Sequence, residues 1–133
     1  MSRILALDFG DKRIGAAISD ESQSIALPLC CIDASNINES ISRIKEICQR
    51  KNIKTIVLGL PLTLKGEKGI QVLKAEKFAQ TLKKTIKASV IFEDERLTTK
   101  EAEKILRQKN KRKKEDVDII SAILILRQYL EKR

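Results

Sequence analysis

Short, mostly apolar segments open the chain and are separated by turn-forming or polar residues. They occupy residues 4–9, 13–19 and 25–32. Gly10 and Asp11 lie between the first two segments, and Asp20 with two polar neighbours precedes the third, which favours tight turns at both places. The pattern predicts three consecutive strands that pair as a meander.

After the third segment, the spacing of apolar residues alternates between that of helices and that of strands. Asn36 and Glu39 form a helix-capping pattern, and apolar residues then recur at helical spacing. The later segments are a strand at 53–60, a helix at 72–86, a strand at 90–93, a helix that opens on the capping pair Thr98 and Glu101, and a largely apolar helix around 117–126. The order βββαβαβαα predicts an α/β fold in which one mixed, five-stranded sheet carries helices on both faces.

The length of 133 residues suits one domain that spans residues 1–133, and the apolar share of 42% excludes a disordered tail. No apolar run is long enough to cross a membrane, and the opening MSRILALDFG lacks the features of a signal peptide. We therefore expect a cytoplasmic protein without membrane contact. The three cysteines form neither a disulfide framework nor a metal-ligand spacing, and we interpret them as reduced core residues.

The net charge and the absence of histidine limit the partners and reactions that suit this chain. The chain has 27 Lys and Arg against 18 Asp and Glu, and the net charge of +9 favours a polyanionic partner such as nucleic acid. It contains no histidine, which excludes Ser-His and Cys-His nucleophiles and His-ligated zinc. Any hydrolysis must therefore rest on carboxylates, whose oxygens suit Mg²⁺ or Mn²⁺.

Acidic residues at three places are candidates for such a site. Asp8 ends the first apolar strand, where a carboxylate needs hydrogen bonds, a cation or an open sheet edge. The acidic triplet at 94–96 follows the last strand, and it shares a sheet edge with Asp8 if the two strands run parallel. Asp118 lies on a helix stripe with apolar residues. Each acid also has a structural interpretation, as a turn cap, a solvated loop or a partner of the helix dipole. If the three converge, they can hold two metal ions that activate water.

Basic residues form a second candidate surface, which would grip a nucleic acid backbone without reading its sequence. The residues that we expect to contact substrate are Lys12, Arg13, Arg96, Arg107, Lys109, Lys111, Arg112, Lys113 and Lys114. The cationic run is also compatible with a solvated loop, and Arg96 with an ion pair to a neighbouring acid.

Four blocks of sequence resemble a known family. They are LALDFGDKRIGAAISD, IVLGLPL, FEDERLTTKEAE and VDIISAILILRQYL. Together they cover nearly the whole chain, in the order in which they occur in the YqgF family, also called RuvX. Its members are described as pre-16S ribosomal RNA nucleases or Holliday junction resolvases. The resemblance implies an RNase H-like fold related to the RuvC resolvases.

The resemblance also implies roles for individual residues. The family's catalytic acids fall on Asp8, Glu95 and Asp118, which would hold two ions, Mg²⁺ or Mn²⁺, with Asp8 bridging both. The family's structural turns fall on Gly10, Gly15, Gly59 and Pro61. This chain departs from the family at Asp11, where Thr is common, and at residues 64–66, which replace a more usual Asp-Gly. The departures leave ion binding at the first turn and substrate contacts at the second loop open.

Three functions are compatible with the sequence. The first is a metal-dependent endonuclease that processes the 5′ end of precursor 16S ribosomal RNA, with the ribosome or a pre-ribosomal particle as a further partner. The second is a Holliday junction resolvase that acts on branched DNA, which requires a two-fold dimer, whereas the sequence is compatible with a monomer or a homodimer. The third is a non-catalytic module that binds nucleic acid. The first turn also resembles that of actin-like ATPases, but these need a second domain that 133 residues do not accommodate.

Overall fold

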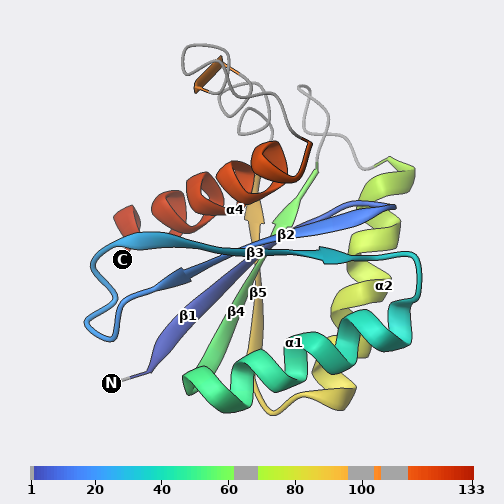
Figure 1. Ribbon diagram of the computed structural model, residues 1–133, viewed down its shortest axis with the longest axis horizontal. Helices are drawn as coiled ribbons and strands as arrows, with labels where there is room; N and C mark the ends of the chain where they lie inside the picture. Colours follow the sequence, from blue (N-terminus) through green and yellow to red (C-terminus); the bar gives the residue numbers. More distant parts are fainter. Residues whose placement is uncertain (1, 62–68, 96–103, 106–113) are drawn as a thin grey trace.

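A five-stranded sheet forms the centre of the computed structural model, which describes residues 2–61, 69–95, 104–105 and 114–133 (Figure 1). The strands are β1 (Arg3–Phe9), β2 (Arg13–Ser19), β3 (Ala26–Asp33), β4 (Ile53–Leu60) and β5 (Ser89–Asp94). They lie in the order β3-β2-β1-β4-β5. β1, β2 and β3 pair antiparallel, while β4 pairs parallel with both β1 and β5. The predicted meander and the mixed, five-stranded sheet are confirmed.

Helices cover both faces of the sheet (Figure 1). α1 (Ile37–Lys51) and α2 (Ile70–Thr85) lie on one face, and α4 (Lys114–Glu131) lies on the other. The helix predicted from Thr98 falls mostly outside the described residues, apart from the helical pair 104–105. Within the part of the chain that the structure describes, no helix is long and apolar enough to cross a membrane.

Polar caps fix both ends of α1. The Asn36 side chain accepts a hydrogen bond from the backbone N–H of Glu39 at 3.2 Å, as its capping pattern predicts. Asn52 ends the helix in the left-handed conformation, with φ at 56°, and its backbone N–H donates to the Cys48 carbonyl. The chain can then turn directly into β4, which begins at Ile53 as predicted.

Alternation along the strands divides the apolar residues between two cores. On the α1–α2 face the central strands contribute large side chains such as Leu5, Leu7 and Leu58. On the α4 face, smaller residues such as Ala6 and Ala17 pack against α4. This smaller layer lets α4 approach the sheet closely. By the same alternation the α4 face also carries Asp8, Gly15, Gly59 and Glu93.

The cysteines only partly match their predicted core positions. Cys48 of α1 is buried, but Cys30 and Cys31 lie half-buried on β3. β3 is an edge strand of the sheet, which explains why its residues reach solvent. All three are free thiols, as predicted.

Asp20 organises the turn between β2 and β3. One carboxylate oxygen accepts hydrogen bonds from the backbone N–H groups of Ser24, at 2.7 Å, and Ile25, at 3.0 Å. The other oxygen accepts a hydrogen bond from the Ser22 hydroxyl. These bonds, that from Ser22 foremost, lower the pKa of Asp20 to about 2. The ionised carboxylate therefore stabilises the folded chain at pH values above its ordinary pKa of 3.8.

We expect Asp20→Asn to lower the free energy of unfolding at pH 6, and the deficit to shrink as the pH falls from 4 toward 2. The reason is that the wild-type carboxylate itself becomes protonated over this range, so that it loses its charge as the variant has. Urea unfolding followed by circular dichroism would measure this. Glu21→Gln removes a neighbouring charge whose ion-pair partner, Arg3, lies outside the turn, and it serves as the control. An Asp20→Asn deficit of constant size at every pH would contradict the assignment.

Candidate active site

Asp8 lies near the carboxyl end of β1, on the face that α4 covers. It pairs with Gly15 of β2, and the preceding residue, Leu7, pairs with Leu58 of β4. The Asp8 side chain is partly buried. Because strands flank it on both sides, the backbone fixes its position without any help from a loop.

Glu95 reaches the same face from the end of β5. Its backbone N–H donates to the Leu60 carbonyl at 3.2 Å, which ties it to the end of β4. The Glu95 side chain is only 6% exposed. It fills the space beside Gly59, where an added Cβ would lie 2.5 Å from Glu95 Oε2. Gly59, predicted as a turn residue, therefore lies inside β4, and its missing side chain makes room for this carboxyl group.

The carboxyl groups of Asp8 and Glu95 form a hydrogen bond with each other. Burial is the main cause that raises the pKa of each, and the mutual repulsion of their charges raises that of Glu95 further. A hydrogen bond between two carboxyl groups requires a proton on one of them. The structure thus brings together two acids that cannot both ionise cheaply unless a cation joins them.

Asp118 approaches this pair from the first turns of α4. Its backbone packs against β2 at Gly15, where an added Cβ would lie 2.0 Å from the Asp118 carbonyl oxygen. The negative charge of Asp118 contributes to the raised pKa of Asp8, so the two carboxylates lie near each other. Gly15 is therefore the residue whose small size lets the helix bring Asp118 to the pair.

The side chain of Asp118 is held by Arg13 rather than by the other acids. Arg13 Nε donates to Asp118 Oδ2 at 2.7 Å. Among the described residues, no three potential ligands are close enough together to hold a metal ion as they stand. The structure joins Asp8 to Glu95 and places Asp118 beside them with its carboxylate turned to Arg13.

The other predicted basic residues divide into two groups. Lys12 is exposed in the turn before β2, and Lys114 is exposed as the first residue of α4. The pattern predicts a helix around 117–126, but α4 extends back to Lys114, because Glu115 and Asp116 in the first turn suit the helix dipole. The remaining predicted contacts lie outside the described residues: Arg96, Arg107, Lys109, Lys111, Arg112 and Lys113.

The other predicted turn residues lie at the ends of strands. The backbone N–H of Gly10 donates to the Arg13 carbonyl at 3.0 Å and so closes the turn between β1 and β2. An added Cβ at Gly10 would lie 2.8 Å from that same oxygen, which explains the need for glycine. Pro61 directly follows β4.

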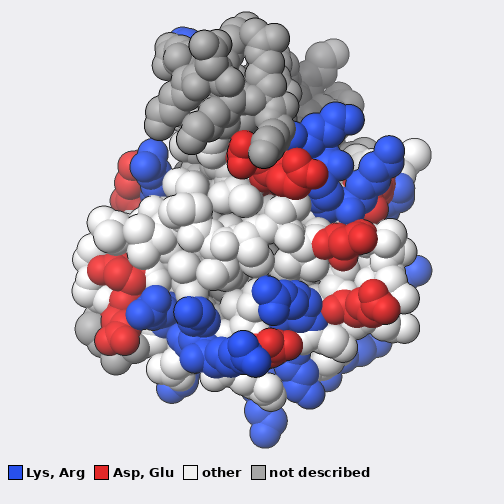
Figure 2. All heavy atoms as spheres, in the orientation of Figure 1, with Lys and Arg blue, Asp and Glu red and all other residues white. Residues whose placement is uncertain are grey.

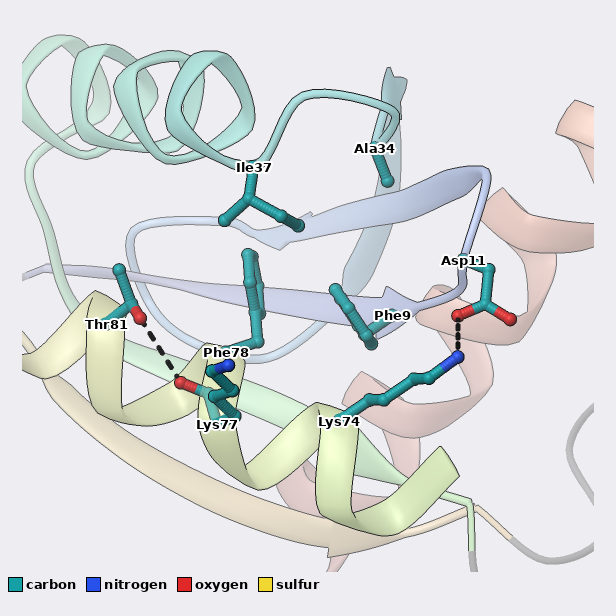
Figure 3. Close-up of a pocket in the computed structure, with 8 residues that line it drawn as sticks. All are labelled: Phe9, Asp11, Ala34, Ile37, Lys74, Lys77, Phe78 and Thr81. Atoms are coloured by element: carbon teal, nitrogen blue, oxygen red, sulfur yellow. Dashed lines mark hydrogen bonds and ion pairs between the residues drawn. The ribbon is translucent and has the colours of Figure 1, made fainter. Parts of the chain in front are cut away.

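The side chain of Asp11 belongs to a different surface. It faces α2, where Lys74 Nζ lies 3.0 Å from one carboxylate oxygen (Figure 3). Gln71 Nε2 donates to the other oxygen at 3.2 Å. It lines a cavity of about 310 Å³ on the α1–α2 side, beside the stacked rings of Phe9 and Phe78. Asp11 therefore does not add a fourth carboxylate to the acidic centre, which lies across the sheet.

A partly buried cluster that no sequence pattern predicted fastens α4 to β5. Gln128 Nε2 donates to Glu93 Oε1 and to the Asp94 carbonyl, both at 2.8 Å, and the Lys132 ammonium also contacts Glu93. Glu93 is only 5% exposed. These contacts hold the end of β5 in place directly before Glu95. One sequence feature could have indicated this cluster. Residues two apart along a strand point to the same face, so Glu93 shares the face of Glu95.

The chain has relatives among known proteins. The sequence matches the RuvX family, described as Holliday junction resolvase, over residues 2–132. A protein from a Sulfurihydrogenibium species is 46% identical over 135 residues, covering 99% of this chain and 92% of the relative. One from Chloroflexus aurantiacus is 41% identical over 133 residues, covering 98% and 87%. Both are named "putative pre-16S rRNA nuclease".

The fold has a counterpart among solved structures. The structure of Thermus thermophilus RuvC in complex with a Holliday junction substrate superposes with a TM-score of 0.64 at 13% sequence identity. The match covers 99% of this chain and 96% of that protein. This similarity confirms the predicted RNase H-like, RuvC-like fold.

Proposed function

The chain belongs to the RuvX family, and from this premise we propose that it is a metal-dependent endonuclease that processes the 5′ end of precursor 16S ribosomal RNA. The nuclease activity itself follows from the family, the RuvC-like fold and the relatives named as nucleases. The observation that carries the proposal is the buried pair of Asp8 and Glu95 with Asp118 beside it. Asp8 from β1 interacts with Glu95 at the end of β5, and Asp118 of α4 lies beside them with its carboxylate turned to Arg13, although the three acids are far apart in sequence.

The acids present at this centre fit a divalent metal ion. They offer only oxygen atoms, which are the ligands that Mg²⁺ and Mn²⁺ prefer. Burial raises the pKa of both Asp8 and Glu95. The charge of Asp118 adds to the rise at Asp8, and the charge of Asp8 adds to the rise at Glu95. A bound cation would remove these penalties. Asp8 and Glu95 would hold one ion, and Asp118 would complete the site for a second. Such ions would activate the attacking water and stabilise the leaving oxygen of the phosphodiester.

The chain's own residues hold the two carboxyl groups in place, and the absence of histidine excludes a histidine general base. Asp8 is fixed between two strands, and Glu95 is fixed by Gly59 and by the bond to Leu60. Both carboxyl groups are therefore pre-organised, which avoids reordering them at each turnover. No histidine is present to act as a general base, so these carboxylates would orient the reacting groups.

Substrate binding would rest on basic residues. Figure 2 shows basic and acidic side chains scattered around a broad uncharged area, without a continuous basic track among the described residues of that face. We assign the grip on the nucleic acid backbone to Lys12, Lys114 and the cationic residues that precede Lys114 in the sequence. Such contacts depend strongly on salt and do not read sequence.

The relatives' names favour precursor ribosomal RNA as the substrate, and the family description favours a four-way DNA junction as the second candidate. The test is to incubate the chain with labelled precursor 16S RNA and, separately, with a four-way junction, each with Mg²⁺ or Mn²⁺. We expect cleavage of the RNA near its 5′ end, abolished by EDTA and by Glu95→Gln.

Other outcomes would assign the protein differently. Symmetric cleavage of the junction with intact RNA would replace the proposal by the resolvase, which must then also be a dimer. Tight RNA binding without any cleavage, indifferent to metal and to Glu95→Gln, would identify a non-catalytic module.

A further inference from the structure

Arg13 places a guanidinium directly on the third acid of the centre. Its Nε donates to Asp118 Oδ2 at 2.7 Å, and the two side chains are 29% and 21% exposed. Water therefore screens this ion pair only in part. A charge-assisted hydrogen bond of this length is stronger than one between neutral groups, and it occupies one of the two oxygens that Asp118 could offer to a metal ion.

Both partners of this ion pair are anchored by their backbones. Arg13 is the first residue of β2, and its carbonyl accepts the bond from Gly10 that closes the preceding turn. Asp118 is pressed onto β2 at Gly15, two residues further along the same strand. The ion pair is thus built into the junction of β2 and α4, unlike the exposed pair of Arg50 and Glu46 on α1.

We propose that Arg13 and the divalent metal ion compete for Asp118, so that Arg13 sets the metal affinity of the acidic centre. The inference rests on the proposed metal-dependent function. A cation that coordinates Asp118 meets the positive charge of Arg13 at the same carboxylate, and the two repel each other. Asp118 can therefore join the site either by giving up its bond to Arg13 at Oδ2 or by offering Oδ1 against the positive charge of Arg13, and both routes weaken metal binding. Arg13 is a positioning residue, because it acts on metal binding by holding the Asp118 carboxylate.

The groups around Arg13 support a competition between Arg13 and the metal ion at the Asp118 carboxylate. The other ionisable groups that act on Arg13 are Glu115, from the first turn of α4, and Cys31, from β3. Asp8 and Glu95 bond to each other. Removing Arg13 should accordingly free Asp118 without disturbing the pair that holds the first ion.

The test measures Mn²⁺ binding by isothermal titration calorimetry, with no substrate present. We expect Arg13→Gln to bind Mn²⁺ about tenfold more tightly than the wild type, the size associated with one charge-assisted hydrogen bond. Lys12→Gln removes the same charge one residue away from an exposed side chain. It should change the affinity by less than about twofold, because exposed charges act weakly through water.

Two further variants decide whether the effect passes through Asp118. In an Asp118→Asn background, Arg13→Gln should no longer change the Mn²⁺ affinity. Arg13→Lys keeps the charge but lacks the Nε–H, so it should bind Mn²⁺ with an affinity between those of the wild type and Arg13→Gln. It also serves as the test variant if Arg13→Gln does not fold, as judged by circular dichroism in EDTA.

The outcomes separate this inference from the function on which it rests. If the wild type binds Mn²⁺ and Arg13→Gln binds it equally or more weakly, or if the gain persists without Asp118, the competition is wrong and the metal-dependent function stands. If the wild type binds no Mn²⁺ at all, the metal-dependent function fails and the inference fails with it.

Discussion

Asp8→Asn is expected to lower metal-dependent cleavage by more than about 100-fold. Loss of a residue that merely orients a metal ligand already costs about 10- to 100-fold, and Asp8 would hold the ion itself. Asparagine keeps the size of the side chain but loses the charge and one of the two ligand oxygens. Single-turnover cleavage of labelled RNA with Mn²⁺ would measure the loss.

Asp8→Asn should raise the stability of the fold although it lowers the rate of cleavage. The pKa of Asp8 is raised on folding, chiefly by burial, so its contribution to the free energy of unfolding declines as the pH rises above the ordinary value of 3.8. Asparagine imitates the protonated acid at every pH. In EDTA at pH 7, Asp8→Asn should therefore unfold at a higher temperature than the wild type, and the difference should shrink toward pH 4.

Asp11→Asn is the matched control for both measurements. Asp11 lies three residues from Asp8, but its carboxylate is bound by Lys74 and Gln71 on the other side of the sheet. Its removal should leave cleavage within about twofold of the wild type, because the residue does not touch the acidic centre. Equal loss of cleavage in both variants, or an Asp8→Asn protein that unfolds earlier than the wild type in EDTA, would contradict the role given to Asp8.

Gly15→Ala is expected to destabilise the fold by about 3 kcal/mol, the upper end of the range for inserting atoms into a packed core. The added Cβ would lie 2.0 Å from the Asp118 carbonyl oxygen and 2.9 Å from its Cβ. These are atoms of the helix backbone and of the first side-chain carbon, so no rotamer change can relieve the clash. α4 must shift, and Asp118 must shift with it. Cleavage should fall together with stability.

Gly69→Ala makes the same chemical change in an open place. Among the described residues, no atom lies within 4 Å of the Cβ position at Gly69, which caps α2 with an extended backbone. Its effect should stay within about 1 kcal/mol, the size of a lost N-cap preference, because alanine caps a helix less well than glycine. Urea unfolding of both variants decides the comparison. Similar destabilisation by the two would mean that the contact between Gly15 and Asp118 does not control the packing of α4.

The strands could be predicted because their pattern is local. The strand at 53–60 has the predicted bounds, since its apolar run ends at a clear Gly-Leu-Pro signal. The meander likewise follows from short turns between neighbouring segments. The start of α4 was placed too late because the lysines before it resemble a solvated connection, while Glu115 and Asp116 already complement the helix dipole.

The acidic centre could be predicted only in part. Asp8 and Glu95 share a sheet edge because β4 runs parallel to both β1 and β5, a condition that the sequence analysis could state but not decide. The bond between Arg13 and Asp118 depends on how closely α4 approaches β2. Gly15 of β2 controls this approach, because it packs directly against α4 at Asp118. The same holds for Gln128 and Glu93, whose contact needs the direction of the helix over the sheet. The catalytic roles of the three acids stay predictions.

The bond between Arg13 and Asp118 joins positions 105 residues apart, and this separation has a consequence for biosynthesis. While the ribosome is still making the chain, the strands can pair before α4 has emerged, but the third carboxylate is then missing. Contacts between such distant positions form late because a long loop must close first. With the role proposed for Asp118, a nascent chain would carry no complete acidic centre next to the messenger and ribosomal RNA around it, and cleavage would begin only when α4 docks.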